Sequence, residues 1–314
     1  MAEQKILRCG PAGWSYPHWD SVVYPRPKPR AFHPLEYLSR YFDTIEINTS
    51  FYGIPRQEVT RVWLSKVSGN PEFQFTAKLH RQFTHERCLD RDAVASFHRG
   101  LRPLLEAGKL GCLLMQFPWS FRFTEENRDF FIRLRRAFSA FPLAAEMRHG
   151  SWMREEALGL FIDYHVAFCN IDQPQRTSTM PPTGCLTSSI GYARLHGRGY
   201  GRWFQEFDQP RRRGRRPDYL YSPEELAGWK ARIDSVRQFA DRVYVITAND
   251  GAGHSVVNAL QLQSMFGLGS NRAPASLART YRKQLNAHRP DTPLQNSLFP
   301  VEAAAQRQLG RAVA

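Results

Sequence analysis

Three ionisable side chains, Glu146, Arg148 and His149, directly follow a short apolar run at residues 143–145. A carboxylate can act as a general base, a guanidinium can grip a phosphate or carboxylate group, and an imidazole can transfer a proton near neutral pH. A strand that only fills a core has no use for three such groups in four positions, because each is costly to bury. We therefore expect this stretch to lie in a functional site.

Five other apolar runs carry polar residues near their C-terminal ends. Side chains alternate between the two faces of a strand, so residues two positions apart share a face. The six polar sets are Glu46 with Asn48, Thr76 with Lys78, Gln116, Glu146 with Arg148, Asn170 with Asp172, and Arg194 with His196. We predict that they converge in one polar cup. The alternative for any single member is an ion pair that only stabilises the fold, but the whole set favours a ligand site.

The mixture of charges in this predicted cup indicates its chemistry. The cations expected to hold a phosphate or carboxylate group are Lys78, Arg148 and Arg194. The acids expected to act as general acid or base, or to hold one divalent cation such as magnesium, are Glu46, Glu146 and Asp172. His196 is predicted to shuttle protons. A multinuclear zinc site is not predicted, because few histidines stand at suitable positions.

Further side chains beside the same run ends are predicted to contact the ligand. They are Trp14, Tyr16, Asn48, Tyr52, Gln116, His149 and Trp152. Aromatic rings among cations suit nucleic-acid bases or sugars, although aromatic residues at such places also serve as plain packing. His149 has the opposite parity to Arg148, unless the strand has ended before it, so it is expected to orient a neighbour or to pack beneath a helix.

Eight β-type runs alternate with helical patterns along the chain. The runs are residues 5–10, 42–48, 73–79, 110–117, 143–149, 166–172, 191–197 and 242–250. Helical periodicity is found at residues 34–41, 58–67, 93–107, 125–138, 154–164, 222–240 and 256–266. This alternation predicts a single TIM-type (β/α) barrel of parallel strands, with its site at the C-terminal ends of the strands. A doubly wound open sheet is the alternative, but no GxGxxG motif follows the first run.

The expected domain organisation is one barrel followed by a tail. Residues 1–270 are assigned to the barrel and residues 271–314 to a basic, partly disordered and flexible C-terminal tail. Long loops are expected over the C-terminal face of the barrel, at residues 172–189 and in the glycine-, aromatic- and arginine-rich stretch 196–222.

The formal net charge is +14, which favours a polyanionic partner such as DNA or RNA. The cluster predicted to bind nucleic acid is Arg211, Arg212, Arg213, Arg215 and Arg216. The excess positive charge extends well beyond these five arginines. General solubility is the alternative explanation of the charge.

The chain lacks membrane and secretion signals. It has no apolar run of about 18 residues or more, and its first residues lack an apolar signal region. Its five cysteines form no CxxC pair and are expected to be reduced thiols. We therefore predict a cytoplasmic protein without a membrane partner.

Seven stretches resemble, in order and spacing, the YecE-like family, also called domain of unknown function 72. They are "GPAGWSYPHW", "FDTIEINTSFYGIP", "FTAKLHRQFTH", "LLMQFPWSF", "AEMRHGSW", "ARLHGR" and "NDGAGHSVVNAL". The resemblance covers about residues 7–266 and implies a TIM-type barrel without bringing an established activity. Its pattern carries onto most of the candidates above and adds Phe51, His85 and Asn249, of which Asn249 joins the predicted ligand contacts. The family tends to have two adjacent asparagines at the last strand end, and here the first is Ala248.

The C-terminal tail contains "QNSLF" at residues 295–299. This pentapeptide resembles the one by which bacterial replication and repair proteins dock on the sliding clamp, with Gln295, Leu298 and Phe299 as the contact residues. The alternative is that the Leu-Phe pair packs on the chain's own barrel.

The sequence is therefore compatible with three alternative functions. The first is a barrel enzyme that acts on a phosphorylated or nucleic-acid substrate by hydrolytic or acid–base chemistry, with a phosphodiester hydrolase as one candidate. The second is a non-catalytic DNA-associated module recruited to the sliding clamp. The third is an isomerase or lyase of a small phosphosugar.

Overall fold

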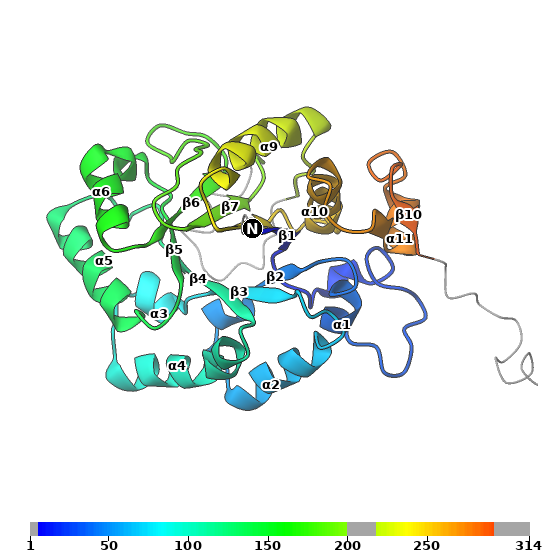
Figure 1. Cartoon of the computed structure of the whole chain (residues 1–314), viewed down its shortest axis with the longest axis horizontal. Coiled ribbons are helices and arrows are strands. Elements are labelled where there is room, and N and C mark those ends of the chain that lie inside the picture. Colours follow the sequence, from blue (N-terminus) through cyan, green and yellow to red (C-terminus); the bar gives the residue numbers. More distant parts are fainter. Residues whose placement is uncertain (1–5, 200–217, 292–314) are drawn as a thin grey trace, which may run out of the picture.

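Eight parallel strands form the centre of the protein in a computed structural model that describes residues 6–199 and 218–291 (Figure 1). They are β1 (Ile6–Pro11), β2 (Thr44–Ile47), β3 (Gln74–Lys78), β4 (Leu110–Gln116), β5 (Leu143–Glu146), β6 (Ala167–Asp172), β7 (Ile190–Leu195) and β8 (Arg242–Thr247). Their order is β1-β8-β7-β6-β5-β4-β3-β2, with every ladder parallel. The gap between β1 and β2 is bridged by the pair Ala12–Glu46 and by a 2.8 Å hydrogen bond from the Gly13 amide to the Glu46 carbonyl. The strands therefore make a nearly closed barrel.

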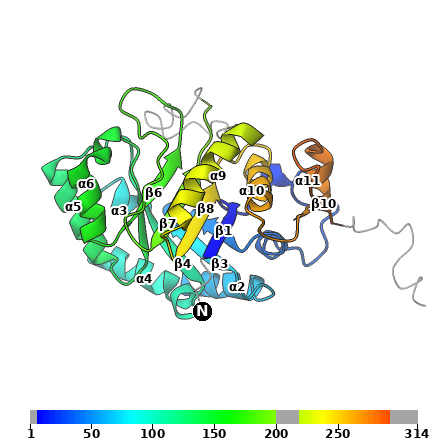
Figure 2. The ribbon, with the colours of Figure 1, turned by 45° about the horizontal axis from the view of Figure 1, so that its top comes forward.

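Helices surround these strands (Figures 1 and 2). They are α1 (Pro34–Leu38), α2 (Gln57–Lys66), α3 (Arg81–Thr84), α4 (Arg91–Glu106), α5 (Glu125–Ala137), α6 (Glu155–Asp163), α9 (Pro223–Arg237) and α10 (His254–Met265). Short 3-10 turns follow three strand ends: η1 (Pro17–Trp19), η2 (Thr49–Phe51) and η3 (Gly150–Met153).

Side-chain caps fix where several of these helices begin. Asp90 accepts a hydrogen bond from the Ala93 amide at the start of α4. At the start of α9, Ser222 and Glu225 form a reciprocal capping box. Because these caps satisfy amides that have no partner inside the helix, local sequence sets the helix starts.

Register decides which strand residues face the inside of the barrel. Neighbours across the β7–β8 ladder point to the same side, as Tyr192 does with Tyr244. The alternating residues Ala193 and Leu195 pack in a separate apolar layer against α9, which lies over β7 and β8 in Figure 2. Tyr192, Arg194 and His196 therefore point inward.

The fold predicted from the sequence is confirmed. All eight predicted strands are present, and each predicted helix has a counterpart within a few residues. The short helix α3 was not predicted. Residues 271–291, which the sequence analysis assigned to the tail, contain β9 (Arg272–Ala273), α11 (Ala275–Thr280) and β10 (Arg289–Pro290) beside α10. In the part of the chain that is described, no helix has the length and apolar character needed to cross a membrane.

Two helical glycines offer a test of the packing. A Cβ atom on Gly100 of α4 would lie 1.9 Å from the Pro55 carbonyl oxygen, whereas one on Gly159 of α6 would meet nothing within 4 Å. We expect Gly100→Ala to lower the free energy of unfolding by at least about 2 kcal/mol. Gly159→Ala is expected to raise it by about 0.5–1 kcal/mol, because alanine loses less entropy in a helix. Urea unfolding followed by circular dichroism measures both, and equal effects at the two positions would contradict this packing.

Candidate functional site

Arg194, at the C-terminal end of β7, is the centre of a buried polar network inside the barrel. Its Nη2 donates to Glu46 Oε1 at 2.8 Å, and its Nη1 donates to Glu146 Oε2 at 3.0 Å. Nη1 also lies 3.2 Å from Gln116 Oε1. One guanidinium thus joins β7 to β2, β4 and β5 across the barrel. Burial alone would lower the pKa of Arg194, but Glu46 and Glu146 raise it, so the side chain stays charged.

Glu146 is shared by three donors. Its Oε1 accepts from Arg148 Nε at 3.0 Å and lies 3.1 Å from His196 Nε2, while its Oε2 accepts from Arg194. Burial alone would raise the pKa of the Glu146 carboxyl, but His196, Arg194 and Arg148 hold it well below its ordinary value. Burial lowers the pKa of His196 to about 3 against the pull of Glu146. At neutral pH the pair is therefore a carboxylate and a neutral imidazole that donates from Nε2.

Glu46 receives a further hydrogen bond that the sequence analysis missed. Tyr192 Oη lies 3.0 Å from both Glu46 Oε2 and Thr76 Oγ1, below Arg194 on the same strand. Strand parity would have found Tyr192, because it is two residues before Arg194. The tyrosine helps to satisfy a carboxylate that has no exposure to solvent.

Lys78, at the C-terminal end of β3, differs from the other cations. Its side chain is only 6% exposed, yet none of the described carboxylates forms an ion pair with it. Its Nζ lies over the ring of Phe51, 4.1 Å from the ring centroid. Burial, reinforced by the charge of Arg194, lowers the pKa of Lys78 to about 7. A large share of this amine is therefore neutral at physiological pH.

Aromatic and histidine side chains border Lys78 towards solvent. Phe51 packs edge-on against Tyr52 and His85, with ring centroids 5.1 and 5.0 Å apart. Tyr52 is 73% exposed. Burial, followed by the charges of Arg148 and Lys78, lowers the pKa of His85 to about 3. Through Phe51, Lys78 is thus connected to a ring that is exposed to solvent.

The remaining predicted ligand contacts are spread around the strand ends. Asn48 donates from Nδ2 to Tyr16 Oη at 3.4 Å. Trp14 packs edge-on against Trp63 of α2, and Trp152 is fully buried with its Nε1 bonded to the Phe121 carbonyl.

His149 and Asn249 have structural partners. His149 Nδ1 accepts from the Ser151 amide at the start of η3. Asn249 donates to the Tyr219 carbonyl and to Asn258. The described contacts of Trp14, Trp152, His149 and Asn249 therefore belong to packing or turn formation.

The prediction that Asn170 and Asp172 point into the cup is wrong. In the β6–β7 ladder, Asn170 is level with Ala193 and Ile171 is level with Arg194, so the two polar residues point outward. Asp172 accepts from Trp229 Nε1 of α9 at 2.8 Å and from Arg198 Nε at 3.0 Å. Parity shows only that residues share a face, and here the outer layer supplies their polar partners.

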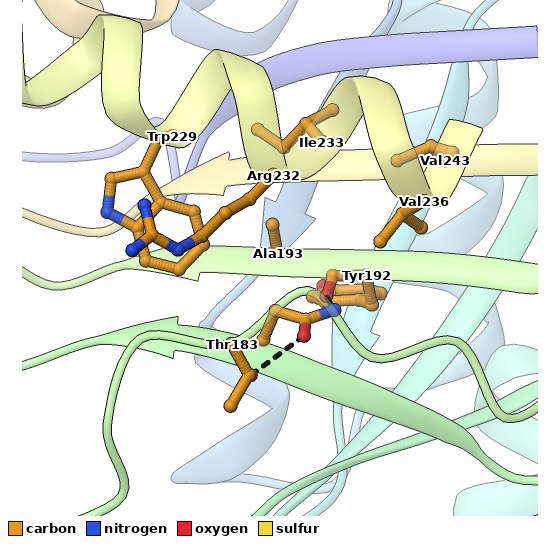
Figure 3. Close-up of a pocket in the computed structure, with 9 residues that line it drawn as sticks. Thr183, Tyr192, Ala193, Trp229, Arg232, Ile233, Val236 and Val243 are labelled. Carbon is orange, nitrogen blue, oxygen red and sulfur yellow. Dashed lines mark hydrogen bonds between the residues drawn. The ribbon is translucent and has the colours of Figure 1, made fainter. Parts of the chain in front are cut away.

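Asn170 lines a small cavity between β7 and α9, and most of the other residues around this cavity are labelled in Figure 3. Thr183 donates to Asn170 Oδ1 at 2.8 Å, and α9 contributes Trp229, Ile233 and Val236 to the same small cavity. The cavity has a volume of about 10 Å³, enough for a single water molecule at most. It lies behind the barrel wall and is not a ligand site.

The donor set of the network does not fit a divalent cation. Glu46 and Glu146 both accept hydrogen bonds from guanidinium groups. These carboxylate oxygens are the atoms that would have to coordinate a hard cation. Among the described residues, no three His, Cys, Asp or Glu side chains are grouped so that they could hold a metal ion. Of the two roles considered for these acids in the sequence, holding one divalent cation such as magnesium does not fit the described network.

Two predicted sites lie outside the described residues. They are the nucleic-acid cluster, Arg211, Arg212, Arg213, Arg215 and Arg216, and the clamp-docking residues Gln295, Leu298 and Phe299.

The unpaired amine of Lys78 predicts a measurable effect on stability. Folding lowers its pKa from 10.5 to about 7, so between these values the unfolded chain binds more protons than the folded one. The burial of Lys78 therefore lowers the free energy of unfolding by its full amount below pH 7. This loss disappears as the pH rises towards the pKa of the unfolded chain. We expect Lys78→Met to be several kcal/mol more stable than the wild type at or below neutral pH, with the two converging in alkaline solution. Urea unfolding at a series of pH values measures this, and a variant less stable in acid would contradict it.

Replacing Glu146 is expected to destabilise the protein, in contrast to replacing Lys78, because Glu146 has charged partners. Glu146→Gln leaves Arg194 and Arg148 with one carboxylate fewer in a buried site, at an expected cost of about 3–5 kcal/mol in unfolding free energy. Glu106→Gln is the matched control, since it removes the exposed ion pair with Arg102 on α4 and should cost much less. Similar losses in the two variants would show that the buried network contributes no more than a surface pair.

Comparisons with known proteins agree with this barrel. The family model described as a protein of unknown function, DUF72, matches residues 8–284. The UPF0759 protein YunF of Bacillus subtilis is 27% identical over 286 residues, which are 87% of this chain and 99% of YunF. The UPF0759 protein YecE of Escherichia coli K12 is 28% identical over 118 residues, 37% of this chain and 39% of YecE.

Solved structures show the same fold. A DUF72 family protein from Thermotoga maritima superposes with a TM-score of 0.71 at 30% identity, covering 83% of this chain and 99% of that one. A DUF72 family protein from Enterococcus faecalis superposes with a TM-score of 0.71 at 24% identity, covering 85% and 100%. With a family model that spans most of its length and a barrel shared with solved members, the chain belongs to the DUF72 family of proteins of unknown function.

Proposed function

We propose that this protein is an enzyme that binds the anionic group of a phosphorylated substrate at the C-terminal mouth of its barrel and acts by acid–base chemistry. The observation that carries the proposal is the amine of Lys78, buried beside two arginines without a carboxylate partner among the described residues. Arg194 and Arg148 are balanced by Glu46 and Glu146. A protonated Lys78 therefore adds one positive charge that the two carboxylates do not balance. A bound anion would compensate this charge.

Each network residue has a proposed role. Arg148 and Lys78, on the side nearest to solvent, hold the anion. Lys78 is also the group whose proton moves near neutral pH, because its pKa is about 7. Glu46 and Glu146, predicted from sequence as acid or base, instead position Arg194 and Arg148 through their ion pairs. The pKa of the Glu146 carboxyl is held well below its ordinary value, which makes Glu146 a weak base and favours this role for it.

Anion binding is expected to be coupled to proton uptake by Lys78. An anion near the amine raises its pKa above the value of about 7 in the free protein. Affinity should therefore be constant below pH 7 and weaken by up to about tenfold per pH unit above it, until the pKa of the complex is reached. Sulfate is a suitable probe, because its own charge does not change from about pH 6 to about pH 9.

Isothermal titration calorimetry with sulfate measures both the affinity and, through buffers of different ionisation enthalpy, the proton uptake. Lys78→Arg should keep the binding but lose its pH dependence, since arginine stays charged. Lys66→Met, which removes a lysine paired with Glu36 outside the network, should behave as the wild type. The proposal fails if the wild type does not bind sulfate or binds it equally at all these pH values.

The same titration distinguishes a small substrate from nucleic acid. We propose a small phosphorylated compound, because Lys78 and Arg148 are recessed and at most 9% exposed. DNA binding through the arginine cluster or recruitment to a sliding clamp would instead leave sulfate affinity at Lys78 unchanged. Duplex DNA that competes with sulfate in the wild type would move the substrate class to nucleic acid.

A further inference from the structure

We infer that the amine of Lys78 is a nucleophile that forms an imine with the carbonyl group of a phosphorylated sugar or a related aldehyde or ketone. This inference rests on the proposed anion site and gives its substrate a second functional group. It assigns to Lys78 a covalent step, whereas charge alone would make it only a binding group.

The surroundings of Lys78 are those of a reactive amine. The amine is buried, its described contact is the face of the Phe51 ring, and no described carboxylate fixes it as an ammonium ion. Arg194 and Arg148 act on it as neighbouring positive charges. Desolvation and nearby cations are the two means by which proteins activate lysine for attack on carbonyl groups. Lys78 has both.

The backbone at Lys78 is fixed, so the amine can be aimed. Ser50 Oγ donates to the Lys78 carbonyl at 2.6 Å and thereby joins the end of β3 to η2, the turn that carries Phe51. The amide of the next residue, Leu79, donates to the Leu114 carbonyl at 2.9 Å. Strand and ring are therefore held as one unit, which limits the directions in which the amine can point.

Imine formation begins when the neutral nitrogen of Lys78 attacks the carbonyl carbon. A C–N bond forms, and the π electrons of the C=O bond move to oxygen, which takes a proton released by nitrogen. The resulting carbinolamine takes a second proton from solvent and loses water, leaving a protonated imine. The positive charge then stands close to Glu46 and Glu146, whose negative charges favour the cationic form of Lys78.

A protonated imine attracts electrons from the neighbouring carbon. A C–H or C–C bond at that carbon can therefore break and leave its electron pair in the imine system. These are the bonds that an isomerase or a lyase of phosphosugars breaks. The placement of Lys78 therefore favours this third class of function over phosphodiester hydrolysis.

The test is reductive trapping on the full-length protein with two aldehydes. Pyridoxal 5′-phosphate carries both an aldehyde and a phosphate group, and pyridoxal is the matched probe without the phosphate. Each is incubated with the protein, reduced with borohydride, and located by peptide mass spectrometry. We expect pyridoxal 5′-phosphate to label Lys78 about tenfold or more above the other lysines, with a pH midpoint near 7, since an ordinary lysine is almost fully protonated there.

Three controls make the result decisive. Lys78→Arg should lose the label at this position while its circular dichroism spectrum remains that of the wild type. Lys66→Arg should label as the wild type, because Lys66 is outside the network. Reduction with D-ribose 5-phosphate in place of the pyridoxal probe should add the mass of that sugar phosphate to the Lys78 peptide.

The outcomes separate this inference from the proposed function. If sulfate competes with pyridoxal 5′-phosphate but no label appears on Lys78, the imine is overturned and the anion site stands. If pyridoxal and pyridoxal 5′-phosphate label Lys78 equally and sulfate does not compete, the anion site and the phosphorylated substrate class are overturned. Phosphate-dependent labelling of Lys78 that sulfate suppresses supports both.

Discussion

The contact of Arg194 with two carboxylates from opposite sides of the barrel is the constraint on which the rest of the site depends. Glu46 and Glu146 have no exposure to solvent, and burying a carboxylate is costly unless a cation is paired with it. One guanidinium serves both, because its planar fork presents donors in two directions at once. Three strands that are far apart in the sequence are thereby joined by charge in the middle of an otherwise apolar barrel.

This arrangement determines what the other cations can do. Arg148 forms a second ion pair with Glu146, in addition to the one from Arg194. Two carboxylates are therefore balanced by two guanidinium groups. Lys78 is left as the one described cation of the network that makes no ion pair within it. Burial and the charge of Arg194 then outweigh the attraction of Glu46 and Glu146 and bring the pKa of Lys78 into the physiological range. Because the two arginines form the ion pairs with both carboxylates, the described network leaves no carboxylate to pair with Lys78.

A buried ion network is weak evidence for stability, because desolvation offsets much of the attraction between the charges. Leucine and alanine side chains could fill the same volume at lower cost, as they do in β4 and β5. The position of the network at the C-terminal ends of the strands, where barrels of this type carry their active sites, favours a functional reason for keeping it.

The sequence by itself determined the barrel and most of the membership of the network. Period-two alternation in the strands and longer-period helices are local properties. The element order, and the grouping of polar residues on one face of each strand, could therefore be derived from the chain alone. Parity does not state which face of a strand is inside the barrel. In β6, Asp172 and Asn170 point outward, where they form hydrogen bonds with Trp229 and Thr183. Pairing across the barrel was also beyond the sequence, because contacts such as Tyr192 with Glu46 join residues 146 positions apart. The tertiary structure alone decided which charges compensate one another, and therefore that Lys78 has no partner in the network. The physical reason is that the free energy of a buried charge depends on neighbours that only the folded chain brings together.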